Sequence, residues 1–212
     1  MRLSNKIVLA SLNPHKFFEF SSLLASYADI ELVSAEGLIR NPEKLGFAEQ
    51  YNTYLENAAA KARLANQASH YPSLSDDTGL EVNALEGRPG VKTHRYAAYK
   101  SGMSQDEANI EKLLGELKGR PATDRGARFV ATLALVIEGV MLHATATLEG
   151  AIAETPRGKN GFGYDPIFIP KGFQKTLAEM TEAEKNTISH RGKALHELMA
   201  QTKSKGIIFA KP

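Results

Sequence analysis

A long hairpin constrains the fold of this chain more than any other feature of the sequence. Residues 127–150, ARFVATLALVIEGVMLHATATLEG, read as two long strands. They are joined at Glu138-Gly139, and a short turn that contains Gly between two strand-like runs is typical of a β-hairpin. The fold must therefore include a sheet with a place for this pair of strands.

Shorter strands and a helix precede the hairpin. Residues 6–11, KIVLAS, and residues 30–34, IELVS, predict buried strands. Between them Asn13 predicts a helix cap, and Pro14 occupies the first helical position, where its missing N–H costs nothing. Residues 35–50 are mixed and polar, which indicates a loop.

Further helices are predicted from capping boxes, in which Ser or Thr is followed three residues later by Glu. A strand from Leu80 to Leu85 separates the first box from the second. Because βα units are mixed with a hairpin, we predict an α/β fold with one mixed sheet flanked by helices. The boxes are Thr53-x-x-Glu56, Ser104-x-x-Glu107 and Thr181-x-x-Glu184.

The composition limits the partners of the chain. Its 212 residues suffice for one large domain or two small lobes with a real core. The net charge is +2 and no basic run is long, which argues against a nucleic-acid partner. The absence of Cys excludes disulfides and thiolate metal sites. No apolar run reaches the ~20 residues of a membrane helix, so we expect a cytoplasmic protein without a membrane partner.

Two adjacent carboxylates, Asp76 and Asp77, stand before Thr78 and Gly79 at a predicted tight turn. Because neighbouring strand residues point to opposite faces, one carboxylate is expected to face a cleft while the other holds local backbone. The first could hold Mg²⁺, which takes one or two carboxylates together with substrate oxygens and water. The alternative is an Asx turn that Gly79 completes.

The segment ASLNPHK, residues 10–16, is a candidate anion site at a helix start. The N-terminus of a helix presents N–H groups and a partial positive charge. Lys16 lies in the first turn, where a cation is unfavourable for the helix dipole. It is either an exposed lysine or the partner of a phosphate at that helix end.

Two later segments carry aromatic and basic side chains. Residues 156–168, PRGKNGFGYDPIF, include three glycines that would let a ligand approach the backbone closely. Phe162 or Tyr164 could stack on a base, and the alternative is an ordinary turn. Residues 184–192, EKNTISHRG, read by themselves as a solvated basic patch on a helix.

Together the segments resemble the inosine triphosphate pyrophosphatase family, whose members hydrolyse non-standard purine nucleoside triphosphates. The resemblance runs from about residue 6 to 200 and keeps the order of the segments. It implies an elongated mixed sheet with two lobes and a central active-site cleft, one domain over residues 1–212, and a homodimer. The segments are ASLNPHK, TYLENAAAKA, SDDTGLEVNALEGRPGV, ARFVATLAL, PRGKNGFGYDPIF and AEMTEAEKNTISHRGKAL.

The resemblance also implies roles for individual residues. Asp77 corresponds to the general base and Mg²⁺ ligand, with Asp76 in support. Glu49 is the candidate second metal ligand, because the family commonly has two glutamates and a Gly where this chain reads FAEQ. The expected substrate-binding residues are Ser11, Leu12, Asn13, Pro14, His15, Lys16, Thr78, Phe162, Gly163, Tyr164, Asp165, Lys185, His190 and Arg191.

The implied reaction is Mg²⁺-dependent cleavage between the α and β phosphates of inosine, deoxyinosine and xanthosine triphosphates, which cleanses the nucleotide pool. Arg191, whose guanidinium only donates hydrogen bonds, is expected to pair with a 6-oxo group and to disfavour adenine. Lys92 and Thr93 replace an aromatic-serine pair that is common in the family, and we expect this replacement to be peripheral. The alternatives are a pyrophosphatase for modified pyrimidine nucleotides and a non-catalytic nucleotide-binding module.

Overall fold

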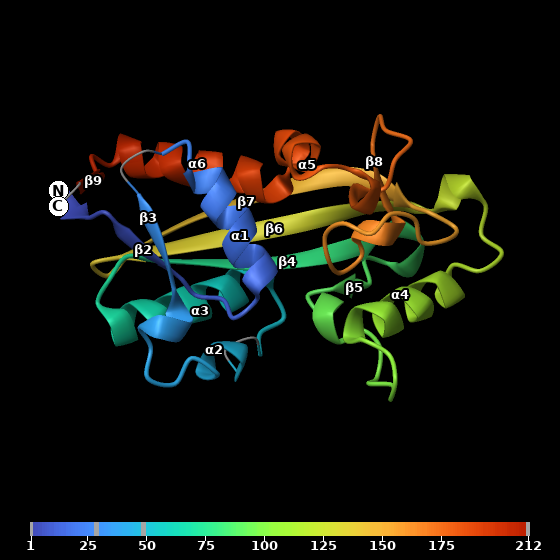
Figure 1. The fold of residues 1–212 in the computed structure, drawn as a ribbon, viewed down its shortest axis with the longest axis horizontal. Helices are drawn as coiled ribbons and strands as arrows, with labels where there is room; N and C mark the ends of the chain where they lie inside the picture. Colours follow the sequence, from blue (N-terminus) through green and yellow to red (C-terminus); the bar gives the residue numbers. More distant parts are fainter. Residues whose placement is uncertain (1, 28–29, 48–49, 211–212) are drawn as a thin grey trace. The chain divides into compact units, whose positions relative to one another are not determined.

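The structure is a computed structural model that describes residues 2–27, 30–47 and 50–210. The chain forms two compact units, which are described separately (Figure 1). Unit 1 comprises residues 1–77, 131–146 and 191–212, and unit 2 comprises residues 78–130 and 147–190. The central cleft implied by the resemblance remains a prediction.

The predicted mixed sheet is confirmed. In the described ranges a sheet of seven strands has the order β3-β2-β4-β6-β7-β8, and β5 pairs with β4. β2 runs parallel to both β3 and β4, while β5 and β8 are antiparallel to their neighbours. The strands are β2 Lys6–Leu9, β3 Glu31–Ser34, β4 Ser73–Val82, β5 Pro89–Gly90, β6 Gly126–Ile137, β7 Val140–Ile152 and β8 Phe168–Pro170.

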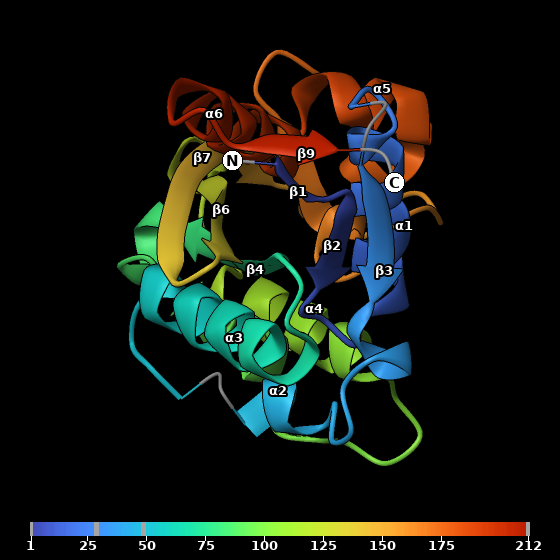
Figure 2. The same ribbon diagram turned by 90° about the vertical axis from the view of Figure 1, so that its left-hand side faces the viewer.

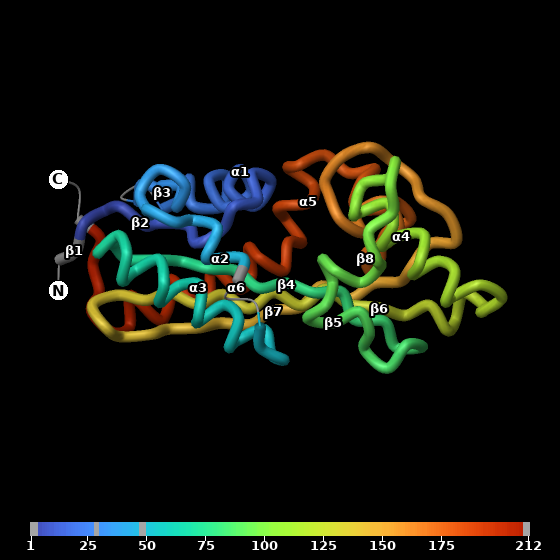
Figure 3. The backbone as a smooth tube through the Cα atoms, turned by 90° about the horizontal axis from the view of Figure 1, so that it is seen from below, coloured from blue at the N-terminus to red at the C-terminus, as the bar shows by residue number. Residues whose placement is uncertain are grey.

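The hairpin predicted from the sequence is the pair β6 and β7. These neighbouring strands are separated by Glu138 and Gly139 alone. The two turn residues have φ angles of 45° and 81°, the left-handed values that a two-residue hairpin turn requires. Gly139 adopts this conformation without the steric cost that other residues incur. Figure 3 shows the turn at the yellow end of the tube that joins β6 and β7.

The predicted helix starts are also confirmed. The Asn13 side chain accepts hydrogen bonds from His15 N and Lys16 N, and Thr53 caps its helix by accepting from Glu56 N. Complete capping boxes begin the helices after Ser104 and Thr181. The helices are α1 Pro14–Leu24, α2 Lys44–Phe47, α3 Tyr54–Ser69, α4 Gln105–Glu116, α5 Glu182–Ile188 and α6 His190–Ser204.

Two predictions of local structure were wrong, and one strand pairing was missed. The SDDTG segment is not a tight turn but the middle of β4, and Gly79 therefore completes no Asx turn. The predicted loop 35–50 contains the short helix α2. The chain ends also form a parallel pair that was not predicted, β1 Arg2–Ser4 with β9 Ile208–Ala210 (Figure 2).

Each unit has a hydrophobic core of its own. In unit 1, Ile7, Phe20 and Leu133 belong to a cluster that α6 joins through Leu198. In unit 2, side chains of α4 pack with Leu80 and Phe168. Over the ranges that the structure describes, no helix combines the length and the apolar character needed to cross a membrane.

Candidate active site

The two carboxylates of SDDTG lie side by side in the middle of β4. Asp76 is 0% exposed and Asp77 is 5% exposed. Because successive strand side chains point to opposite faces, each carboxylate meets a different set of helices. Asp76 contacts side chains of α1 and α6, and Asp77 contacts side chains of α3. Figures 1 and 2 show α6 and α3 on opposite sides of β4.

Asp76 binds two buried cations through one carboxylate oxygen. Its Oδ2 lies 2.9 Å from Lys16 Nζ and 3.2 Å from Arg191 Nε. Arg191 Nη1 also donates to Glu19 Oε2 over 2.9 Å. Lys16 is 3% exposed, so the expectation of an exposed lysine is wrong. Its ammonium group belongs to an ion-pair network at the start of α1.

Asp77 is held from α3 by Asn57 and Lys61. Asn57 Nδ2 donates to Asp77 Oδ2 over 3.1 Å, and Lys61 Nζ lies 3.5 Å from Asp77 Oδ1. Lys61 Nζ also donates to the backbone O of Asp76 over 2.7 Å. The sequence analysis missed both residues. Their spacing of four within one helix, which places them on one face, is the signal that could have found them.

We call Lys16, Glu19, Lys61, Asp76, Asp77 and Arg191 the carboxylate cluster. It contains three carboxylates and three cations that form close ion pairs. Their side chains are at most 14% exposed. Removing one partner from such a buried pair leaves a charge uncompensated, which is costly. The three negative and three positive charges of the cluster therefore balance one another. A bound anion or cation would compete for these ion-pair partners.

The oxygen donors of the cluster fit Mg²⁺ better than a transition metal. Nowhere in residues 2–27, 30–47 and 50–210 do three or more His, Cys, Asp or Glu gather as a metal site. Mg²⁺ needs only one or two carboxylates when phosphates and water complete its shell. Asp77 suits this role, because Lys61 Nζ lies 3.5 Å from its Oδ1, whereas Lys16 Nζ lies only 2.9 Å from Asp76 Oδ2. Glu49 lies outside the described residues.

The start of α1 combines a cap with exposed side chains. Asn13 Oδ1 accepts from His15 N over 2.9 Å, and Ser11 Oγ accepts from Asn13 N over 3.2 Å. Leu12, Pro14 and His15 are exposed. The predicted phosphate segment therefore has a fixed backbone and an open surface.

In unit 2, the predicted base-stacking residues Phe162–Asp165 are anchored to three other segments. Asp165 Oδ2 accepts from Phe162 N over 3.3 Å and from Lys185 Nζ over 2.9 Å. The hydroxyl of Tyr164 donates to Thr93 O over 3.0 Å. Burial raises the pKa of the Tyr164 phenol above its usual value, so the hydroxyl keeps its proton. Gly163 N donates to Asp106 Oδ2 over 2.8 Å.

Two of the three glycines in this segment serve packing within the protein. A Cβ on Gly161 would overlap the Asp165 carboxylate, and one on Gly158 would overlap the backbone of Ala178. A Cβ on Gly163 would meet no atom within 4 Å. Close approach of a ligand, which the sequence predicted for all three, is therefore open only at Gly163.

Thr93 is buried in unit 2 and shares hydrogen bonds with three other residues. Its Oγ1 accepts from Leu80 N over 2.9 Å. Its carbonyl oxygen accepts from Tyr164 Oη and from Asn109 Nδ2. A serine at this position would keep the hydroxyl that accepts from Leu80 N.

The SHRG segment is buried rather than solvated. The His190 ring stacks on Phe129, with ring centroids 5.2 Å apart and an interplanar angle of 14°. His190 and Arg191 are each 6% exposed, so a solvated basic patch is excluded at these two positions. Thr78 is also buried, and Lys185 is exposed only in part.

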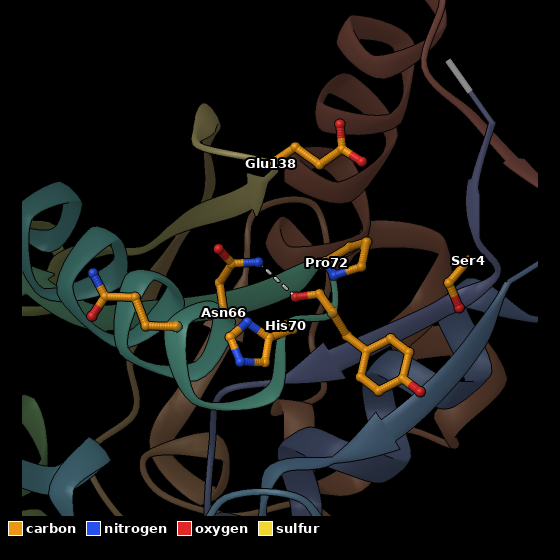
Figure 4. Close-up of a pocket in the computed structure, with 7 residues that line it drawn as sticks. Ser4, Asn66, His70, Pro72 and Glu138 are labelled. Carbon is orange, nitrogen blue, oxygen red and sulfur yellow. Dashed lines mark hydrogen bonds between the residues drawn. The ribbon is translucent and has the colours of Figure 1, made fainter.

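A separate pocket in unit 1 contains none of the predicted site residues. It has a volume of about 540 Å³ and lies beside Ser4, His70 and Glu138 (Figure 4). The hydrogen bond from Asn66 Nδ2 to the carbonyl oxygen of Tyr71 crosses its wall over 2.7 Å. This pocket is distinct from the carboxylate cluster.

Comparisons with known proteins give one consistent result. Residues 7–201 match the model of the Ham1 family. The chain is 46% identical over 194 residues to a dITP/XTP pyrophosphatase of Christiangramia forsetii, covering 92% of this chain and 97% of that protein. It is 42% identical over 200 residues to the dITP/XTP pyrophosphatase of Bacillus subtilis, covering 93% of this chain and 97% of that protein.

Solved structures agree with the sequence matches. The Ham1 protein of Staphylococcus aureus superposes with a TM-score of 0.75 at 35% identity, covering 94% of this chain and 99% of that one. A HAM1 protein of Coxiella burnetii superposes with a TM-score of 0.77 at 38% identity, covering 94% of this chain and 98% of that one.

Proposed function

The chain belongs to the Ham1 family, and on this premise we propose that it hydrolyses non-standard purine nucleoside triphosphates. Its substrates are dITP, XTP and ITP, and its products are the nucleoside monophosphate and pyrophosphate. The observation that carries this proposal is the 46% identity over 92% of the chain to a dITP/XTP pyrophosphatase. The buried carboxylates of β4 supply chemistry that suits it.

We assign the phosphate chemistry to the carboxylate cluster. Asp77 accepts a proton from the attacking water, whose oxygen bonds to phosphorus as the α–β anhydride bond breaks. Lys16, Lys61 and the N-terminus of α1 bring positive charge to the phosphate oxygens. Asp76, held by two cations, keeps Lys16 and Arg191 in place. Ser11 to His15 contact the triphosphate.

We propose that Asp77 holds Mg²⁺, with Glu49 as a second ligand. The oxygen donors of β4 support this assignment, because Mg²⁺ prefers carboxylate oxygens. When bound, the ion offsets negative charge on the phosphate oxygens.

We assign base recognition to Phe162–Asp165, with Thr78, Lys185 and His190 as further substrate contacts. Three amides of this segment donate within the protein: Phe162 N, Gly163 N and Asp165 N. In the described part of the chain no acceptor is found for Tyr164 N. This donor suits a 6-oxo group, whereas the 6-amino group of adenine would place a donor against a donor. Such a mismatch costs about 1–3 kcal/mol, or about 5- to 150-fold in affinity.

A pyrophosphate-release assay tests the proposed function. The protein is given purine and pyrimidine nucleoside triphosphates, with Mg²⁺ or with EDTA. We expect fast pyrophosphate release from ITP, dITP and XTP that EDTA abolishes. Preferred turnover of modified pyrimidine nucleotides would contradict the substrate class, and binding without release would show a non-catalytic module.

We also propose that the protein is a homodimer in the cytoplasm. The resemblance to the pyrophosphatase family supports the dimer, and the composition supports the location. Light scattering after size exclusion would give twice the 23.1 kDa chain mass for a dimer. Cell fractionation would find the protein with the soluble contents, and a membrane-bound pool would contradict the location.

A further inference from the structure

We propose that Asp106 on α4 is a positioning residue for base recognition, because its carboxylate fixes the backbone of Gly163. This inference rests on the proposed function for its effect on catalysis. The contact itself belongs to unit 2 and joins residues 57 positions apart in the sequence. Figure 3 shows the orange segment that precedes β8 beside α4.

Asp106 and Glu107 divide two tasks at the start of α4. Glu107 completes the capping box, because its Oε2 accepts from the backbone N of Ser104 over 2.8 Å. Asp106 Oδ2 instead accepts from Gly163 N over 2.8 Å. A hydrogen bond to an ionised carboxylate is shorter and stronger than one between neutral groups. The contact is therefore suited to hold a loop rather than to start the helix.

The helix that carries Asp106 is a rigid support. Asn109 Nδ2 donates to Thr93 O and to His94 O, each over 3.2 Å. Leu113 is buried in the core of unit 2. Because Tyr164 Oη donates to the same Thr93 carbonyl, α4 restrains the loop at two successive residues. One restraint is direct, through Asp106, and the other passes through Thr93.

Gly163 is the residue that most needs this restraint. Its φ is +61°, and a Cβ built there would meet nothing within 4 Å. No atom therefore packs against it where a Cβ would stand, and Gly has more conformational freedom than any other residue. The hydrogen bond to Asp106 fixes the orientation of this peptide group, and Tyr164 N, the proposed base-reading donor, follows directly. Loss of the hydrogen bond would let the Tyr164 N–H adopt several orientations and would weaken base binding.

Three variants separate positioning from general stability. Asp106→Ala removes the acceptor, whereas Asp106→Asn keeps an oxygen that can accept from Gly163 N. Both remove the same negative charge from the first turn of α4, so their effect on the helix dipole is equal. Glu107→Ala is the matched control, because it damages the neighbouring cap and leaves the loop contact in place.

The first readout needs no activity. The chain contains no Trp, so Phe162→Trp introduces a single fluorescent reporter into the loop. In the absence of nucleotide, we expect its anisotropy to fall when Asp106→Ala is added and to stay unchanged with Asp106→Asn or Glu107→Ala. Equal anisotropy in the parent and in Asp106→Ala would overturn the positioning role.

The second readout is steady-state kinetics with ITP. It uses proteins that keep the natural Phe162 and carry no Trp reporter. We expect Asp106→Ala to raise KM about tenfold with little change in kcat, in line with the loss of one charge-assisted hydrogen bond. Asp106→Asn should restore KM to within about twofold of the wild type. An unchanged KM in Asp106→Ala overturns the proposal. A fall in anisotropy in a protein that hydrolyses no nucleotide would support positioning and refute the proposed function.

Discussion

The carboxylate cluster of unit 1 and the Phe162–Asp165 loop of unit 2 are built from different interactions. The cluster consists of side-chain charges from α1, α3, β4 and α6 that neutralise one another. The loop is held mainly through its backbone amides and one ion pair between Asp165 and Lys185. The proposed function gives the two regions different tasks: charge for phosphate chemistry, and fixed backbone geometry for the choice of base.

We expect the carboxylate cluster and the Phe162–Asp165 loop to respond differently to substitution. Taking one charge out of the cluster leaves a buried partner uncompensated, so stability and rate both change. Taking one hydrogen-bond acceptor from the loop frees a backbone amide at Gly163, so we expect binding to change while the fold persists. Substitutions in the two regions should therefore affect rate, stability and base preference differently.

The largest expected effect is that of Asp77→Asn on turnover. The amide keeps the shape of the side chain but neither accepts a proton nor holds a cation well. Loss of a general base typically costs ~10²–10⁴-fold in rate, and weaker metal binding adds to that. Pyrophosphate release from ITP measures the loss, and circular dichroism checks the fold.

Asp76→Asn is the matched control for Asp77→Asn. Compared with Asp77→Asn, it should lose more stability, because Asp76 holds both Lys16 and Arg191. It should lose less turnover. The opposite order of turnover losses would show that the roles of the two carboxylates are exchanged.

Arg191→Ala tests whether the base is read by the cluster or by the loop. Two nitrogens of this guanidinium donate to carboxylates of unit 1, which favours a role in the charge balance. We expect a stability loss of up to about 3 kcal/mol and a loss of about 10- to 100-fold in kcat/KM on every nucleotide. The ratio of kcat/KM for ITP to that for ATP should hold. A narrower ratio, lost chiefly on the ITP side, would assign base reading to Arg191, as the sequence predicted.

Glu49→Gln tests whether a residue outside β4 contributes to Mg²⁺ binding. We expect the Mg²⁺ concentration for half-maximal rate to rise about tenfold, since loss of even a supporting partner of a ligand typically costs that much. Glu43→Gln is the control, because this exposed acid lies in the same segment. An unchanged Mg²⁺ titration would mean that the metal relies on Asp77, phosphates and water alone.

The smallest effect concerns acid stability of unit 2. Hydrogen bonds from Ser104 and Thr181 lower the pKa of Glu107 and Glu184 below the usual 4.5. A lowered folded-state pKa gives stability that is present above the unfolded value and is lost as pH falls through the folded value. In the double variant Glu107→Gln/Glu184→Gln, the melting temperature should therefore fall less steeply with decreasing pH below about pH 4.5 than in the wild type. If the melting temperature of the variant changed with pH as steeply as that of the wild type, this role of the caps would be contradicted.

Local signals predicted much of the fold. Helix starts at Asn13 and Ser104 and the turn at Glu138-Gly139 depend on residues that are close in the sequence, so the pattern sufficed. The SDDTG turn was mispredicted because two acids in a row are rare in a buried strand. In β4 they are stabilised by cations of α1, α3 and α6 and by the Asn57 amide.

The site could be predicted in part. The segments that carry Asp77 and Phe162–Asp165 stood out by composition, yet their anchors did not. Lys61 and Asp106 lie on helices whose sequences look ordinary, and only the fold brings them to Asp77 and to Gly163. The pairing of β1 with β9 escaped for the same reason, because it joins the two ends of the chain.

The division of tasks is tested most directly by the binding of nucleoside monophosphates to Asp77→Asn. Calorimetry gives Kd for IMP and for AMP without turnover, in this variant and in the wild type. If the loop chooses the base, as proposed, the ratio of the two Kd values should be the same in both proteins, with AMP at least about fivefold weaker. A variant that binds IMP and AMP equally well would show that the carboxylate cluster itself selects the base, and would contradict the division.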